Sequence, residues 1–102
     1  MMFGADSHNI GDATPYLPTE SAWVREFLQA GIFETVLQKA DHSGAFVWLR
    51  AADLAAARDS IGRLPLVASG ITKVEFTEVI PFDTIPGDRA SQSAFRSAAH
   101  RA

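Results

Sequence analysis

The stretch IFETVLQKADHSGAFVWLRA, residues 32–51, decides the fold class of this chain. Its two halves, 32–39 and 44–51, are rich in β-branched and aromatic residues, which favour strands. Between them, Asp41, His42 and Ser43 precede a glycine, a composition typical of a tight turn. The stretch therefore predicts a β-hairpin.

The residues before the hairpin predict a strand and a helix. Residues 1–8 (MMFGADSH) can form a first strand, although Gly4 and Asp6 are poor strand residues. An apolar stripe at helical spacing then predicts a helix between a cap at Thr19 and a C-terminal glycine, Gly31. We expect the aromatic residues of this stripe to lie in the core.

The residues after the hairpin predict the same pair in reverse order. Residues 52–63 are rich in alanine and predict a second helix, which Pro65 ends. Residues 72–80 alternate between apolar and polar side chains and predict a strand with one buried face. Residues 83–102 are expected to form an extended tail with a short helix near 94–99.

The predicted order is strand, helix, strand, strand, helix, strand. This is the βαββαβ order of the ferredoxin-like α+β fold, in which a four-stranded antiparallel sheet carries both helices on one face. We therefore expect one ferredoxin-like domain at 1–82 and a C-terminal tail at 83–102. In this topology the weak first strand lies in the centre of the sheet.

Composition excludes several function classes. The chain has 102 residues, enough for one domain, and 47% of them are apolar. Nine Lys and Arg against twelve Asp and Glu give a net charge of −3, which argues against a nucleic-acid partner. The absence of cysteine excludes disulfides and thiolate chemistry. No segment has the length of a membrane helix or the pattern of a signal peptide, so we expect a cytoplasmic protein without membrane contact.

The hairpin predicts which side chains share a face of the sheet. A turn at 41–43 would pair Gln38 with Phe46, Val36 with Trp48, and Glu34 with Arg50. The helix-covered face would then carry Thr35, Leu37, Ala45, Val47 and Leu49, together with Met1, Phe3 and Ala5 of the first strand. The open face would carry Glu34, Val36, Gln38, Phe46, Trp48 and Arg50, together with Asp6, His8 and Glu75.

The predicted open face is half polar and half aromatic. It is too apolar for bare solvent and too polar for a dry core, so we expect a second copy of the chain to cover it. The homodimer, or a higher oligomer, would enclose a lumen able to hold a small organic molecule.

From Glu20 to Phe82 the sequence resembles the dimeric α+β barrel superfamily, and within it the muconolactone-isomerase-like and YCII-related small proteins. The resemblance rests on the helix SAWVREFLQAG, the strand pair ETVLQKADHSGAFVWLRA, the Leu-Pro-Leu at 64–66 and the strand end Val-Ile-Pro-Phe at 79–82. It implies a dimer with an enclosed pocket and an activity among lactone isomerases, polyketide cyclases, cofactor-free monooxygenases or proteins without known activity. The YCII-type His–Asp pair does not transfer, because no histidine lies near Ser21 or Ala22.

The first candidate for catalysis is His8 with Asp6. Both side chains point the same way on a strand, and a carboxylate beside an imidazole fixes its tautomer for proton transfer. Arg50 is the candidate holder of a substrate anion. The alternatives are a solvated histidine at a strand end and a surface ion pair between Arg50 and Glu34.

The candidate substrate-binding residues surround this group on the same face. Phe46 and Trp48 would form an apolar wall, or else the core of the dimer, and Glu34 and Glu75 would line the lumen, Glu75 as a second possible base. His42 is explained by the turn and His100 lies in the tail. The three histidines have no metal-ligand spacing, so we expect neither a metal nor another cofactor.

These residues predict an isomerase or cyclase that uses acid–base proton transfer on a lactone, enone or polyketide-like molecule. Two alternatives stay open. One is a non-catalytic ligand-binding or accessory dimer, and the other is a cofactor-free monooxygenase acting on an electron-rich phenol.

Overall fold

The structure, a computed structural model, describes residues 1–82 of the chain. Within them the elements are β1 (Met2–Asn9), η1 (Thr14–Tyr16), α1 (Leu17–Gln29), β2 (Phe33–Gln38), β3 (Ala45–Arg50), α2 (Leu54–Gly62), α3 (Pro65–Ala68) and β4 (Thr72–Val79). The predicted tail, with its helix at 94–99 and His100, lies outside the described residues. No helix within residues 1–82 is long and apolar enough to cross a membrane.

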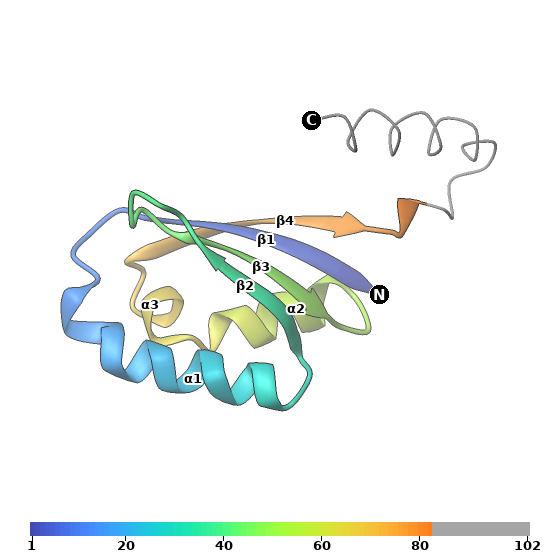
Figure 1. Ribbon diagram of the computed structural model, residues 1–102, viewed down its shortest axis with the longest axis horizontal. Coiled ribbons are helices and arrows are strands. Elements are labelled where there is room, and N and C mark those ends of the chain that lie inside the picture. Colours follow the sequence, from blue (N-terminus) through green and yellow to red (C-terminus); the bar gives the residue numbers. More distant parts are fainter. Residues whose placement is uncertain (83–102) are drawn as a thin grey trace, which may run out of the picture.

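The strands form one antiparallel sheet in the order β2-β3-β1-β4. All three α-helices lie against one face of this sheet, and the other face is open (Figure 1). The ferredoxin-like α+β fold predicted from the order of elements is therefore confirmed. In the described part of the chain the two faces of the sheet therefore differ. One face is covered by the helices and contains the core, and the other face is open.

The central position of β1 is explained by what its poor strand residues contact. Gly4 pairs with Trp48 of β3, and a Cβ at Gly4 would lie 3.1 Å from the Trp48 ring. The missing side chain therefore makes room for the indole across the sheet. Asp6, the other poor strand residue, forms an ion pair with Lys39.

The register of the hairpin differs from the prediction by one residue. Lys39 N–H donates to the Gly44 carbonyl, so the loop contains Ala40 as well as the expected turn residues. The strands then pair Gln38 with Ala45, Val36 with Val47 and Leu37 with Phe46. Because side chains alternate, this shift exchanges the faces of β2.

The face assignment of β2 was therefore wrong. Val36 and Gln38 lie on the helix-covered side, whereas Thr35 and Leu37 lie on the open face. An irregularity between Phe33 and Thr35 places one extra residue, Glu34, in the strand, and β3 keeps the predicted alternation.

The helices also begin elsewhere than predicted. Helix α1 starts at Leu17 and has no side-chain cap, so Thr19 lies inside its first turn; Pro18 fits there because first-turn N–H groups need no helical partner. Gly31 follows the helix with φ 76°, as expected of a C-terminal glycine. Pro65 does not only end α2; it also begins the unpredicted short helix α3.

The core lies between the sheet and the helices. Its buried side chains include Phe3 and Ala5 of β1 and Val47 and Leu49 of β3, as predicted. Phe27 of α1 packs on Phe33 with ring centroids 4.9 Å apart. Met1 does not join this core; it precedes β1 and is 61% exposed.

One side chain replaces part of the backbone pairing between β1 and β3. Ser7 Oγ accepts a hydrogen bond from the Ala45 N–H and donates one to the Ala45 carbonyl, both at 3.0 Å. Ser7→Ala is expected to lower the free energy of unfolding by about 1–2 kcal/mol, because both half-buried groups of Ala45 lose their partner. Urea unfolding measures this effect, and a stability equal to that of wild type would contradict it.

Candidate functional site

The side chains predicted to form the site do share the open face of the sheet. Asp6 and His8 point there from β1, and Glu75 and Lys73 stand opposite them on β4. Phe46, Trp48 and Arg50 occupy the same face of β3. The open face thus has an apolar centre formed by Leu37, Phe46 and Trp48, which are 55%, 45% and 39% exposed. Charged side chains surround this centre.

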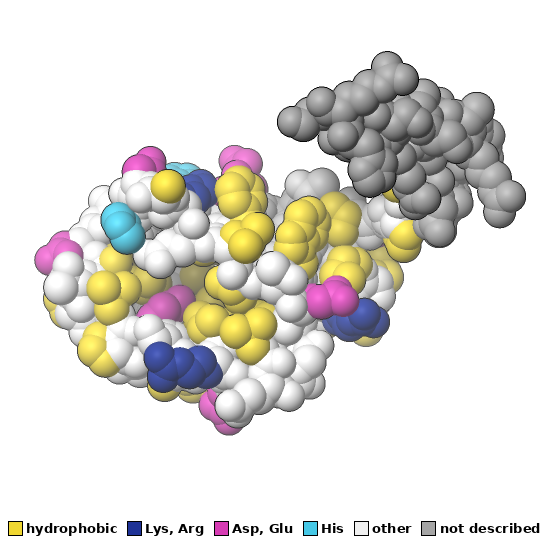
Figure 2. Space-filling view, in the orientation of Figure 1, with side chains coloured by type: hydrophobic (Ala, Val, Ile, Leu, Met, Phe, Trp, Pro, Cys, Tyr) yellow, Lys and Arg dark blue, Asp and Glu magenta, His cyan; other side chains and the backbone are white. Residues whose placement is uncertain are grey.

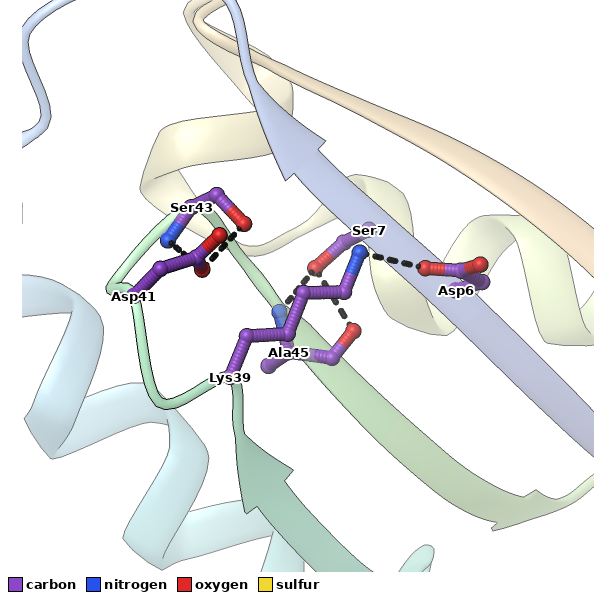
Figure 3. Close-up of polar contacts among 6 residues, drawn as sticks. All are labelled: Asp6, Ser7, Lys39, Asp41, Ser43 and Ala45. Carbon is purple, nitrogen blue, oxygen red and sulfur yellow. Dashed lines mark hydrogen bonds and ion pairs between the residues drawn. The ribbon is translucent and has the colours of Figure 1, made fainter.

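Asp6 contacts a lysine and, within residues 1–82, makes no hydrogen bond or ion pair with His8. Asp6 Oδ1 lies 2.8 Å from Lys39 Nζ (Figure 3). The ammonium group of Lys39 also lies 5.1 Å from the centroid of the Phe46 ring. The buried Oδ1 accepts no aligned hydrogen bond, so the contact is an ion pair. The described residues therefore show no contact through which Asp6 would orient His8, as had been predicted.

Glu34 and Arg50 form the expected cross-strand pair. Arg50 Nη2 donates to Glu34 Oε1 at 3.2 Å, and both side chains are exposed. An exposed pair of this kind adds little to stability, because water screens both charges. The roles of these open-face residues in catalysis or binding stay predictions.

A concave pocket lies on the other side of the sheet. It is a half-open cavity of about 740 Å³ between α1, the end of β1 and the hairpin, and Figure 2 shows this hollow with an acidic side chain among hydrophobic ones. Its size is that of a site for a small organic molecule. None of the seven predicted site residues belongs to its lining in the described part of the chain.

The pocket has an apolar floor with a few polar side chains. Val24, Val36, Val47, Leu64 and Val74 are among its apolar residues. Its polar residues include Ser7, Glu20, Arg25, Gln38, His42 and Thr72. This composition, mostly apolar with a few placed polar groups, is typical of ligand sites.

Glu20 is the half-buried acid of the pocket. Its Oε1 accepts a hydrogen bond from the Leu66 N–H at 3.0 Å, and its other oxygen has no partner within residues 1–82. Burial raises the pKa of this carboxyl above 4.5, and the hydrogen bond from Leu66 opposes that rise. Glu20 is therefore both a cap for the short helix α3 and a group able to hold or release a proton inside the pocket.

Two other carboxyl groups near the pocket have lowered pKa values, in contrast to Glu20. The Thr14 N–H, at 3.0 Å, lowers the pKa of Asp12. The hydroxyl of Ser43 and then its N–H lower the pKa of Asp41. Both groups are exposed and stay ionised, and their hydrogen bonds hold the loops in which they lie. Glu20 is therefore the candidate acid–base group of the pocket.

The raised pKa of Glu20 predicts a pH-dependent stability. Between its unfolded value and its raised folded value, the folded state holds more protons, so stability falls as pH rises through this window. Glu20→Gln keeps an acceptor for Leu66 and removes the charge. The melting temperature of Glu20→Gln minus that of wild type should therefore be larger at neutral pH than well below pH 4.5. Glu26→Gln, on the exposed side of the same helix, is the control, and an equal difference at both pH values would contradict the prediction.

The polar pairs of the pocket wall are arranged in two groups. At its floor, the buried Thr72 donates to Asn9 Oδ1 at 2.6 Å. At its rim, Gln38 Nε2 lies 3.1 Å from His42 Nδ1.

Arg25 also lines the pocket and has no ion-pair partner within residues 1–82. No group of three or more metal-binding side chains occurs in these residues.

The fold matches two solved enzymes over most of their length. Muconolactone isomerase superposes with a TM-score of 0.68 at 15% identity, covering 84% of this chain and 95% of that one. The 5-chloro-2-hydroxyhydroquinone dehydrochlorinase of Burkholderia phenoliruptrix AC1100, in complex with 2,5-dihydroxybenzoquinone, gives 0.68 at 11% identity, covering 82% and 98%. This chain has the muconolactone isomerase fold. No protein-family model matches the sequence, and no curated protein matches it significantly.

The resemblance drawn from the sequence is thus confirmed for the muconolactone isomerase fold. The pocket itself was not predicted. One signal for Glu20 was available, because it lies three and four residues before Trp23 and Val24 and so on the same apolar stripe of the helix. Gln38 could not be found, because the shifted register had moved it to the open face.

Proposed function

We propose that this protein is a small-molecule isomerase or cyclase that moves a proton on a lactone, enone or polyketide-like substrate in the pocket beneath α1. The observation that carries this proposal is the Glu20 carboxyl, half-buried in an apolar cavity, with one oxygen bonded to the Leu66 N–H and the other without a partner within residues 1–82. A carboxyl group in this position can take a proton from carbon and return it. Burial, which brings its pKa closer to neutral pH, makes both steps accessible.

For a β,γ-unsaturated lactone the steps balance without a co-reactant. The Glu20 carboxylate takes a proton from the α carbon, and the electron pair of that bond is delocalised onto the carbonyl oxygen as a dienolate. The carboxylic acid then returns the proton to the γ carbon, and the double bond ends in conjugation with the carbonyl. In a cyclase the enolate carbon would instead form a bond to a second carbonyl carbon, whose π electron pair moves onto its own oxygen. The Glu20 carboxylic acid would then return the proton to that oxygen and not to the γ carbon.

The two fold neighbours support this class of substrate. Their names describe a lactone isomerase and an enzyme that binds a dihydroxybenzoquinone, both acting on small oxygenated rings. A cavity of about 740 Å³ would hold a molecule of this kind. Arg25 at the pocket lining could pair with a substrate carboxylate.

The test is to incubate the protein with α-angelica lactone in D₂O and to follow the α and γ positions by proton NMR. Deuterium incorporation or conversion to the conjugated isomer above the buffer rate is the expected result. Binding without exchange, seen as a ligand-induced rise in melting temperature, would instead favour the non-catalytic alternative. Oxygen consumption with an electron-rich phenol would favour the monooxygenase.

We also propose that the open face pairs with a second copy of the chain. Its exposed apolar side chains, Leu37, Phe46 and Trp48, lie on adjacent strands and form a patch that a monomer would leave in water. Lys39, Asp6, Glu34 and Arg50 ring this patch with both signs of charge. A two-fold pairing would bring such a self-complementary patch against itself.

Leu37→Asp is expected to weaken this dimer by about 2 kcal/mol, because it would place a charge inside an apolar contact. Light scattering coupled to gel filtration over a dilution series measures the change. Leu28→Asp is the matched control, since Leu28 is a 39% exposed leucine of α1 and lies on the helix side. Equal behaviour of the two variants would show that the open face is not the contact.

A further inference from the structure

The tip of the β2–β3 hairpin holds a histidine in a constrained conformation. His42 has φ 63°, the only positive φ of a non-glycine residue within residues 1–82. This left-handed conformation is uncommon outside glycine and costs free energy, so the surrounding contacts must hold it. They do: the His42 N–H donates to the Lys39 carbonyl at 2.9 Å, and Asp41 Oδ1 accepts from both N–H and Oγ of Ser43, at 3.0 and 2.6 Å.

The hairpin is also fixed to the neighbouring strand on both faces of the sheet. On the open face Lys39 is paired with Asp6, and on the pocket side Ser7 bonds twice to Ala45 (Figure 3). Beyond them the Asn9 N–H donates to the Ser43 carbonyl at 2.7 Å. Residues 38–44, called the arm below, therefore form a fixed segment at the rim of the pocket. His42 of this arm lines the pocket, as does Glu20.

The contact with the Gln38 amide nitrogen indicates the tautomer of the imidazole. Its side-chain amide nitrogen, which can only donate, lies 3.1 Å from His42 Nδ1. Nδ1 is then the acceptor, so the proton of the neutral ring is on Nε2. The imidazole thus presents an N–H donor beyond the Gln38 contact.

We propose that the arm 38–44 presents the Nε2–H of His42 to the carbonyl oxygen of the substrate, and that Gln38 is the residue that positions it. This rests on the proposed function: while Glu20 removes the α proton, His42 would stabilise the negative charge that develops on the oxygen. A fixed donor aimed at developing charge accelerates a reaction because it needs no reorganisation. Asp6, predicted as an orienter of His8, acts in this account by anchoring the arm through Lys39.

The tautomer is tested first, without any activity, by long-range ¹H–¹⁵N NMR of the full-length chain. His42→Asn identifies the His42 signals by their loss. We expect an unprotonated Nδ1 and a protonated Nε2 in wild type. Gln38→Glu should reverse the two, because a carboxylate accepts a proton from Nδ1. A protonated Nδ1 in wild type, or no change in Gln38→Glu, overturns the proposal.

The second test separates this proposal from the proposed function. Adding α-angelica lactone should move the His42 Nε2 signal, and no movement at saturating lactone overturns the role of the arm whether or not the protein is active. If wild type shows no proton exchange, the proposed function fails and the NMR result alone decides on the arm.

With an active wild type, the kinetics identify the step that His42 serves. His42→Gly removes the imidazole and suits the left-handed backbone, so it should lower kcat by about 10²-fold with little change in KM. His42→Asn keeps an N–H donor and should be intermediate. Gln38→Glu should lower kcat like His42→Gly, whereas Gln29→Glu, the same charge change at an exposed position of α1, should not. An unchanged kcat in His42→Gly overturns the proposal.

Discussion

Glu20→Gln is expected to lower kcat for lactone isomerisation by about 10²–10⁴-fold, the usual contribution of a positioned acid–base group. The amide has the shape of the carboxyl and can accept the same hydrogen bond from Leu66, so α3 keeps its cap and the pocket keeps its form. Only the ability to exchange a proton is lost. Substrate affinity should therefore change far less than kcat.

The measurement is a comparison of kcat and KM with α-angelica lactone, or with the most active member of a lactone and enone panel. Glu26→Gln is the matched control, since it removes the same charge from the same helix at an exposed position. The pH profile adds a second criterion, because the acidic limb of kcat in wild type should lie above pH 4.5 and should be absent from the residual activity of Glu20→Gln. A variant with wild-type kcat would show that the acid–base group lies elsewhere.

Gly44→Ala is expected to lower the free energy of unfolding by about 3 kcal/mol or more, as severe overpacking does. A Cβ built on Gly44 would overlap the carbonyl oxygen and carbon of Ser7 and would lie 2.9 Å from His8 Cα. These are backbone atoms, so no side chain can move aside. Strands β1 and β3 would have to separate, which would break the paired bonds between Ser7 and Ala45.

Gly62→Ala is the matched comparison and should have the opposite sign. Gly62 is the last residue of α2, and a Cβ there would meet nothing within 4 Å. Alanine in a helix is more favourable than glycine by about 0.5–1 kcal/mol, so this variant should be slightly more stable than wild type. Urea unfolding of the two variants measures both effects. Equal stabilities would contradict the close approach of the hairpin to β1.

Most of the fold could be predicted because local patterns and topology agree. The alternation at 72–80, the apolar stripe of α1 and the turn at 41–44 together specify one βαββαβ arrangement, and the structure confirms it. The start of α1 and the short helix α3 were missed, since Pro18 and Pro65 act there as first-turn residues of helices. Proline alone does not distinguish the end of one helix from the start of the next.

The candidate site was less predictable, because it depends on the register of one hairpin. A single extra loop residue, Ala40, moves Gln38 from the open face to the pocket and leaves Phe46 and Trp48 where they were expected. Turn composition alone does not distinguish a loop of three residues from one of four. The pocket also joins residues far apart in sequence, such as Glu20 and Leu66, whose contact follows only from tertiary packing.

The space left by Gly4 has a practical value for studying assembly. Trp48 lies over this glycine on the open face and is 39% exposed, whereas Trp23, the other tryptophan, packs on Phe27 at the helix layer with ring centroids 5.7 Å apart. The two indoles therefore report on different sides of the sheet. Fluorescence of Trp48, and its quenching by iodide, offers an optical signal of whether the open face is covered, without any attached label.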